Sequence, residues 1–145
     1  NTMWYQVQEM LRIEKGGQDQ LKDELLAYNP LIPNGSELVA TLMFEINNPD
    51  IRAAFLSGLG GVEELITMRV GENIITAVPE EDIDRTSATG KASSVQFIHF
   101  NLSEAVIEDF KKAGVPVVLG INHAKYSHST ILQEGSRSIL AMDFA

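Results

Sequence analysis

The chain has 145 residues, 44% of them hydrophobic, a formal charge of −9 at pH 7 and no cysteine. The length suits one domain with a single core, and the lack of cysteine excludes disulfides, thiolate metal sites, iron–sulfur ligation and a cysteine nucleophile. The negative charge disfavours nucleic acid and anionic membranes as partners, and no apolar run is long enough to cross a bilayer.

Two amphipathic helices are predicted at the N-terminus, within residues 1–28. The first begins at Asn1-Thr2 and runs to about Lys15, because apolar residues recur at three- and four-residue steps. Gly16-Gly17 ends it, and the second helix covers Gln18–Tyr28. The chain opens without an initiator methionine, so we expect that an upstream segment is missing. The absence of a signal peptide favours a cytoplasmic protein.

A strand, a helix and a hairpin are predicted next. Glu37–Ile46 is rich in β-branched and apolar residues, which is typical of a strand. Asn48-Pro49-Asp50 predicts a helix start, with Asn48 as the N-cap. The residues expected to face inward are Ile51, Phe55 and Leu59. Glu64–Val70 and Asn73–Val78 predict antiparallel strands joined by Gly71-Glu72.

The C-terminal half repeats this order after a small, polar stretch, Thr86–Ser93, which we expect to be a mobile loop. Ser94–Asn101 predicts a strand, and Ser103 predicts the N-cap of a helix that ends before Gly114. Val115–Ile121 predicts another strand, with Pro116 at its start or at a sheet edge. A short closing helix is expected from Ser136.

An internal repeat decides the predicted fold. A shift of 55 residues places Asn48 on Ser103, Phe55 on Phe110 and the strand at 40–46 on the strand at 95–101. Two β-α-β units, at about 37–70 and 94–121, predict an α+β two-layer sandwich. We expect a ferredoxin-like arrangement in a single domain, 1–145, with the extra hairpin strand Asn73–Val78 and helices at both termini. Another antiparallel α+β sheet with a different strand order is the alternative.

The candidate site follows the last predicted strand. Its residues are Asn122, His123, Lys125, Tyr126 and His128. His123 and His128 do not converge on a regular helix or strand, and a metal would need a third ligand such as Glu45, His99 or Asp143. We therefore expect no metal and no cofactor. An acid–base role for a histidine beside the tyrosine is a further possibility. The structural interpretation is a loop leaving the sheet, with the Tyr126 ring covering the core edge. His99, on a strand face with Phe97, is expected to be packed with its ring nitrogens satisfied locally.

Three blocks of the sequence are distinctive, namely Tyr5–Glu14, Ala27–Gly35 and Gly120–His128. Together they resemble a bacterial domain-of-unknown-function family, number 3501. The resemblance implies that a basic segment precedes Asn1, and that the genes of members lie near those of rubrerythrin-like and iron–sulfur proteins, which associates the family with redox or oxidative-stress physiology. The family often has Asp where this chain has Asn122, whereas His123, Tyr126 and His128 match. It brings no established catalytic residues.

The sequence leaves the function unknown and supports two hypotheses. The first is a non-catalytic accessory or protein-interaction domain, a homodimer with a possible protein partner, linked to redox or oxidative-stress physiology. The alternative is a small metal- or ligand-binding enzyme with a site around His123, Tyr126 and His128. An enzyme needs these side chains to converge on a concave pocket with a carboxylate or hydroxyl, whereas an interaction domain would have them splayed or buried.

Overall fold

The computed structural model describes residues 2–80 and 90–145, which form two compact units. The first, here called the helical hairpin, ends at Asn34, and the second, the sheet unit, comprises Gly35–Ala145. The sequence analysis placed the N-terminal helices in the same domain as the sheet; the structure describes them as a compact unit of their own. Among the described residues, no helix has both the length and the apolar character needed to cross a bilayer.

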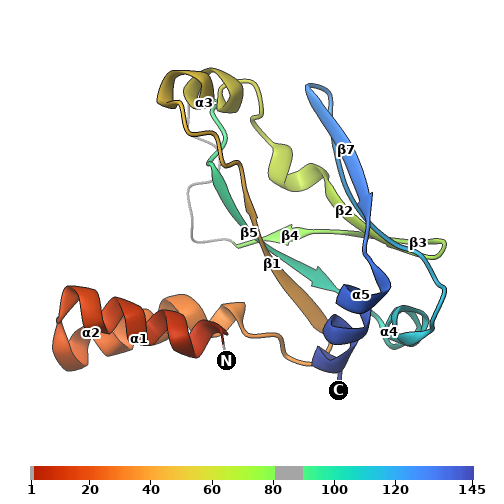
Figure 1. Cartoon of the computed structure of the whole chain (residues 1–145), viewed down its shortest axis with the longest axis horizontal. Helices are drawn as coiled ribbons and strands as arrows, with labels where there is room; N and C mark the ends of the chain where they lie inside the picture. The colour runs from red at the N-terminus through yellow and green to blue at the C-terminus, as the bar shows by residue number, and fades with distance from the viewer. Residues whose placement is uncertain (1, 81–89) are drawn as a thin grey trace. The chain divides into compact units, whose positions relative to one another are not determined.

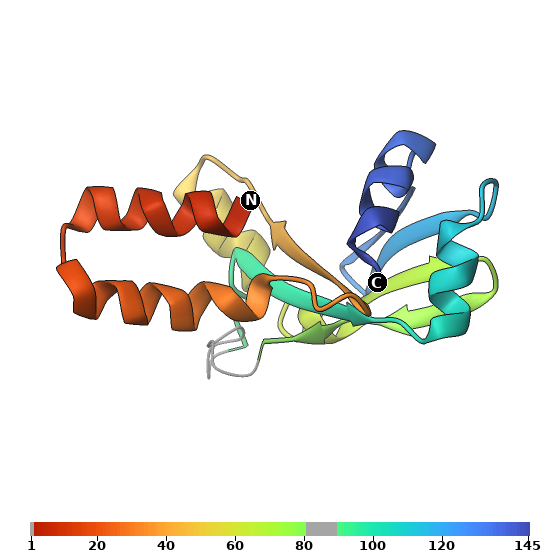
Figure 2. The ribbon, with the colours of Figure 1, turned by 90° about the horizontal axis from the view of Figure 1, so that it is seen from below.

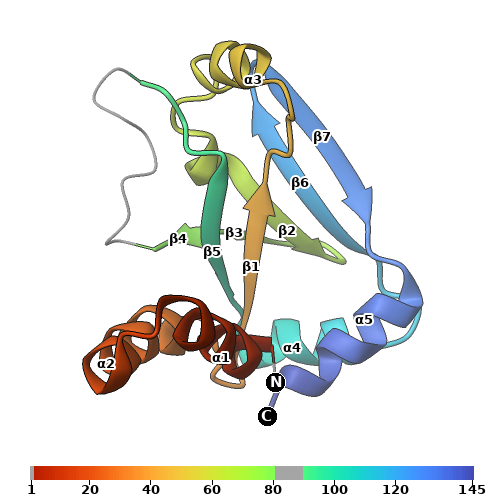
Figure 3. The same cartoon turned by 60° about the vertical axis from the view of Figure 1, so that its left-hand side comes forward.

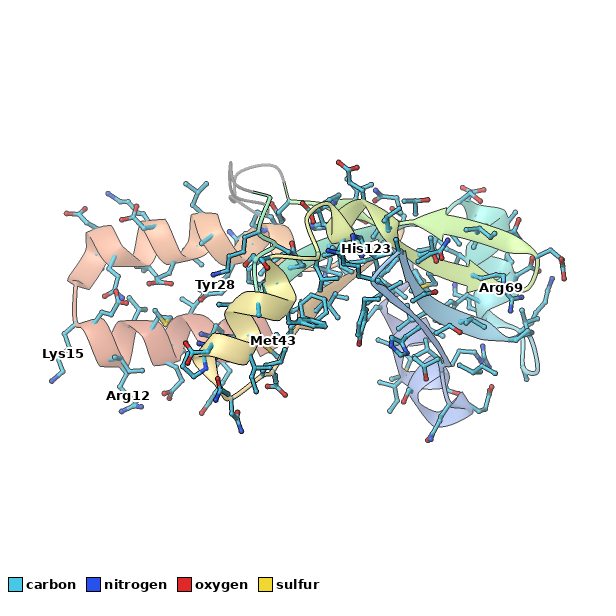
Figure 4. All side chains as sticks on the ribbon, turned by 90° about the horizontal axis from the view of Figure 1, so that it is seen from above. Arg12, Lys15, Tyr28, Met43, Arg69 and His123 are labelled. Carbon is cyan, nitrogen blue, oxygen red and sulfur yellow. The ribbon has the colours of Figure 1, made fainter. Side chains whose placement is uncertain are left out.

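The helical hairpin consists of α1 (Thr2–Glu14) and α2 (Gly17–Tyr28), followed by one 3₁₀ turn, η1 (Asn29–Leu31). The two helices run antiparallel beside each other (Figure 2), as the predicted bounds imply. Val7 of α1 is buried, none of the described residues of α2 is, and Trp4 of the predicted apolar face is 70% exposed. Arg12 of α1 and Lys15, which directly follows α1, point away from the helical hairpin (Figure 4). Short helices that bury so little apolar surface gain little stability from each other, so their stability depends on packing against other surfaces.

The sheet unit contains two antiparallel sheets (Figure 1). The first has the order β1-β5-β4 and the second β3-β2-β6-β7. The strands are β1 (Glu37–Met43), β2 (Ile66–Val70), β3 (Asn73–Thr76), β4 (Val78–Pro79), β5 (Val95–Asn101), β6 (Val117–His123) and β7 (Tyr126–Ile131). The helical segments are α3 (Pro49–Leu56), η2 (Val62–Leu65), α4 (Glu104–Lys111), α5 (Glu134–Leu140) and η3 (Ala141–Asp143).

The α+β class with helices at both termini is confirmed, but the ferredoxin-like arrangement is not. Each predicted strand–helix–strand unit leads from one sheet into the other, so its two strands are not parallel neighbours in a single sheet. Each strand pairs instead with its counterpart in the other half, β1 with β5 and β2 with β6, both antiparallel. The two halves therefore repeat the same order of strand, helix and strands along the chain, but not the predicted pairing within one sheet. The shift of 55 residues also places Phe44 on His99, and here the two halves differ, because Phe44 is buried in a core cluster whereas His99 contacts two carboxylates.

One run of chain belongs to both sheets. The strand β3 pairs with β2, and the last bond along this edge joins Ala77 N to Ile66 O at 2.9 Å. The chain then continues into β4, where Val78 lies opposite His99 of β5. This run of chain thereby joins the two sheets along one border. The helix α3 lies at one end of the sheet unit, and α4 and α5 lie at the other (Figure 3).

The core has two parts. The larger cluster fills the space between the sheets and α4, and it includes Phe100, Phe110 and Val117, each at most 1% exposed. The smaller cluster packs beside α3 and contains Phe44, Leu56, Leu59, Val62 and Ala92. Ile51 is 61% exposed, so its predicted inward position is wrong. Leu56, five residues later, is buried instead, because five residues turn a helix by roughly 140° and so direct Leu56 and Ile51 to different sides of α3.

Capping side chains explain where some helices begin. Asn48 caps α3 as predicted, since its side-chain oxygen accepts from Asp50 N and Ile51 N at 2.9 and 3.0 Å. Ser103 stands at the N-cap of α4 but makes no side-chain cap bond. The closing helix begins at Glu134, after Gln133, and not at Ser136.

Other local predictions have mixed outcomes. Pro116 directly precedes β6, which lies between β2 and β7, so the edge position is excluded and the starting position holds. The hairpin across Gly71-Glu72 is confirmed. Residues 86–89 of the predicted loop Thr86–Ser93 lie outside the described residues.

A buried arginine joins the C-terminal helix to α4. Arg137 is 4% exposed and donates through its guanidinium to the carbonyl of Phe110 and to the carboxylate of Glu134. The hydrogen bond from Arg137 holds the pKa of Glu134 below its usual value. The same end of the core is closed by Phe144, whose ring meets Phe110 edge to face at 5.2 Å.

Candidate binding site between the two sheets

The segment that carries the predicted site is a β-hairpin and not a loop. The strand β6 extends to His123, β7 begins at Tyr126, and these two residues face each other across a turn of Ala124 and Lys125. The Lys125 amide donates to His123 Nδ1 at 3.1 Å, so this ring helps to close the turn. The prediction of a loop at Asn122–His128 is wrong because the backbone pairs on both sides of this two-residue turn, although most side chains of β7 are polar and exposed.

The hairpin sorts the predicted residues onto different surfaces. Side chains alternate between the two faces of a strand, and Tyr126 and His128 share the face that looks between the sheets. Both line a cavity of about 330 Å³. Asn122 is exposed and lies opposite Ser127. The cavity lining does not include Asn122, His123 or Lys125, so the structure brings together two of the five candidate residues, Tyr126 and His128.

The cavity lies inside the sheet unit and is lined from both sheets. Its apolar walls come from Leu42 of β1, Ile98 and Phe100 of β5, Ile66 of β2, and Leu119 and Ile121 of β6. Its polar side is β7, which contributes His128, Ser129 and Thr130 in addition to Tyr126. None of the described residues that line it is a carboxylate. An apolar chamber with an imidazole and hydroxyls on one wall is typical of a ligand site.

Tyr126 has a structural role as well. Its ring meets Phe44 and Phe55 edge to face at 5.7 Å each, and those two rings meet at 5.6 Å. The His128 ring lies tilted against Tyr126 at 4.5 Å. Tyr126 therefore covers the edge of the smaller core cluster, as expected, and also orients the exposed His128 beside the cavity.

His99 lies outside the cavity, packed between acids. Its Nδ1 is 3.1 Å from Glu37 Oε2 and its Nε2 is 2.8 Å from Glu80 Oε1, which confirms that both ring nitrogens are satisfied locally. The two carboxylates contact opposite sides of the ring, so they do not surround a common point. Within residues 2–80 and 90–145, no three His, Asp or Glu side chains are grouped closely enough to hold a metal ion.

Sequence reasoning missed most of the cavity. The apolar lining residues were assigned to strands but not to a common chamber, because their meeting depends on how the two sheets face each other. One local signal was present in β7, where Tyr126, His128 and Thr130 alternate with serines. That two-residue period indicates a strand and would have placed the three side chains on one face.

The chain is similar in sequence and structure to a solved structure and matches a family model. A crystal structure of a protein of unknown function from Burkholderia pseudomallei K96243 is 37% identical to this chain, with a TM-score of 0.88. The similarity covers 99% of this chain and 75% of that one. Among curated proteins, none matches. A family model described as "Protein of unknown function (DUF3501)" matches residues 1–144, and the chain therefore belongs to that family.

Proposed function

We propose that the chain is a non-catalytic binding domain whose sheet unit takes an apolar group into the cavity between its sheets. The cavity itself is the observation that supports this function. At about 330 Å³ it falls within the size range of ligand sites, roughly 300–1,000 Å³. Its apolar walls favour an apolar guest, because binding removes the apolar surface of both from water. His128 and Thr130 supply hydrogen-bonding groups that can orient such a guest.

The arrangement favours binding over catalysis. General acid–base chemistry usually needs a base that a second group orients, and the described cavity lining provides one imidazole with no carboxylate beside it. His123 is directed to the turn amide of Lys125 instead of the cavity. The alternative of an enzyme built on His123, Tyr126 and His128 therefore lacks one of its three groups at the chamber.

Decanol is a suitable probe because it combines an apolar chain with one hydroxyl. Methyl NMR of the full chain should show saturable shifts at Leu42, Ile98 and Ile121 upon titration. The variant Ala40→Phe should abolish them, since Ala40 lines the cavity and the larger ring fills it. The matched variant Val39→Phe points to the opposite face of β1 and should retain binding. Unshifted lining methyls in the wild-type chain would refute the proposal.

We also propose that the chain forms a homodimer in the bacterial cytoplasm and works with a protein partner. The helical hairpin supports self-association, because Trp4 and Leu26 are 70% and 78% exposed and apolar surface of this kind marks interaction sites. Light scattering should give twice the 16.0 kDa of the chain, and Leu26→Lys should reduce this to the monomer. A monomeric wild-type chain at every concentration would refute it. The link to redox or oxidative-stress physiology stays a prediction from the family resemblance.

A further inference from the structure

One edge of β1 is unpaired within the sheet unit. Phe44 N donates to Ser94 O at 2.8 Å at the end of the ladder with β5. Because backbone groups of successive residues point to opposite edges of a strand, the even-numbered residues of β1 bond to β5. The amides and carbonyls of Val39, Thr41 and Met43 therefore point to the other edge. No described residue of the sheet unit pairs with them.

Between Glu37 and Glu45, this edge carries none of the features that usually prevent strand addition. Native proteins protect exposed edges with charged side chains, proline or bulges. The segment Val39–Met43 has no charged residue and no proline, and its register with β5 continues without a bulge. By contrast, the short edge strand β4 contains Pro79. Among the described residues of the sheet unit, this edge of β1 is thus open to pairing.

The repeat indicates what belongs beside this edge. Both halves contain a hairpin with a two-residue turn, β2-β3 and β6-β7, and superposing the turns places Val78 on Ile131. Val78 has left its own hairpin to pair antiparallel with β5. Ile131 remains paired with Val118 of β6 and is 66% exposed. In the first half, the chain after the hairpin forms β4, which covers the edge of β5 that faces away from β1. In the second half, the chain after the hairpin forms no such strand, so the corresponding edge of β1 stays uncovered among the described residues of the sheet unit.

The strand with this edge also lines the cavity. Ala40 and Leu42 of β1 line it on one side, and Ser129 and Thr130 of β7 line it on the other. A strand added to β1 directs every second side chain to the face that Ala40 and Leu42 share. Those side chains would enter the cavity while the backbone bonds to β1. One extended peptide therefore satisfies both the unpaired edge and the apolar chamber.

We infer that the partner is an extended segment of another protein that runs antiparallel to β1, in the place that β4 takes beside β5, and inserts apolar side chains at alternate positions into the cavity. This inference rests on the proposed function, because it names what carries the apolar group. The chain has a formal charge of −9, which favours a neutral or basic segment over an acidic one. Backbone pairing supplies the affinity and the cavity selects the side chains.

The probe is an acetylated and amidated peptide, KTLTVTK, whose leucine and valine alternate with threonines. Titration into the full chain should give saturable heat and shift the amides of Val39, Thr41 and Met43. Two N-methylated forms serve as controls, each methylated at one alternating set of amides. The form whose methyl groups face β1 should lose binding, and the other should retain it. Equal binding of both forms would overturn strand addition, as would shifts confined to β7.

A matched pair of variants tests the protein side. Val39→Pro removes an amide donor that β5 does not use, while Val39→Thr keeps both the donor and the branched side chain. We expect Val39→Pro to weaken the peptide about tenfold, the weight of one backbone hydrogen bond, and Val39→Thr to bind as the wild type does. Neither variant should alter decanol binding, because Val39 does not line the cavity. Equal peptide affinity in Val39→Pro and Val39→Thr would overturn the inference.

The two proposals fail in different ways. Decanol binding without peptide binding would overturn the strand-addition inference and leave the proposed function intact. Loss of both would overturn both. Thermal melting of each variant identifies any that is unfolded, and the pair of N-methylated peptides tests the inference on the wild-type chain alone.

Discussion

Replacing Tyr126 separates its two roles at the cavity. Its ring makes edge-to-face contacts with Phe44 and Phe55 at 5.7 Å each, and each such pair contributes about 0.5–1.5 kcal/mol beyond simple burial. Tyr126→Leu keeps much of the apolar volume but removes both ring contacts, so it should lower the free energy of unfolding by about 1–3 kcal/mol. Tyr126→Phe keeps both contacts and should leave stability nearly unchanged.

Urea denaturation followed by circular dichroism measures this difference. Phe55→Leu is the matched control, because it also removes two ring contacts, with Phe44 and Tyr126, but leaves the cavity lining in place. The two leucine variants should lose similar stability, and only the one at Tyr126 should also weaken decanol. If Tyr126→Leu is as stable as Tyr126→Phe, the ring cluster does not stabilise the hairpin and this reasoning is refuted.

Three other predictions concern stability. Asn48→Ala should lower the free energy of unfolding by about 1 kcal/mol, because the cap bonds are lost. Ser103→Ala should lower it clearly less, since the Ser103 side chain makes no cap bond. Equal losses of stability in urea denaturation would contradict this prediction. The pKa of Glu134 is lower in the folded protein than its usual value. The hydrogen bond with Arg137 therefore stabilises the fold at pH values above the usual pKa of glutamate. This stabilisation is lost as the pH falls through the lowered pKa of the folded state. The urea midpoint of Glu134→Gln should therefore fall below wild type at about pH 7 and approach it at about pH 2, whereas a constant gap would refute the assignment. His99→Leu removes the ring that two partly buried carboxylates contact and should lower the free energy of unfolding by about 1–3 kcal/mol, measured against the exposed-site control His128→Leu; equal losses would contradict it.

Most elements could be predicted because their signals are local. Asn48-Pro49 marks the start of α3, Gly71 and Glu72 mark a hairpin turn, and the apolar periodicity of α1 depends only on neighbours along the chain. The exception among the strands is β7. It lies at the edge of its sheet with most side chains exposed, so burial gave its sequence no apolar stripe, and its polar residues indicated a loop.

The sheet order and the cavity could not be predicted in the same way. Which strands pair is decided by contacts between residues far apart in sequence, such as Leu38 with Phe100 and Met68 with Leu119. The predicted β-α-β units are compatible with one sheet or with two. The candidate site was the least predictable part for this reason. His123 and His128 are close in sequence but lie on different strands, and only His128 faces the cavity.

The strand run from Asn73 to Pro79 couples the stability of the two sheets, since it is hydrogen-bonded to β2 through one part and to β5 through the other. Neither sheet can open along this border without releasing bonds of its neighbour. In native-state hydrogen exchange, the amides of β2 and β5 should accordingly share one opening free energy and behave as a single cooperative unit. Local opening is then directed to the opposite side of the sheet unit, where β1 and β7 each have an edge that no other described strand of this unit covers, and where a partner would have to enter.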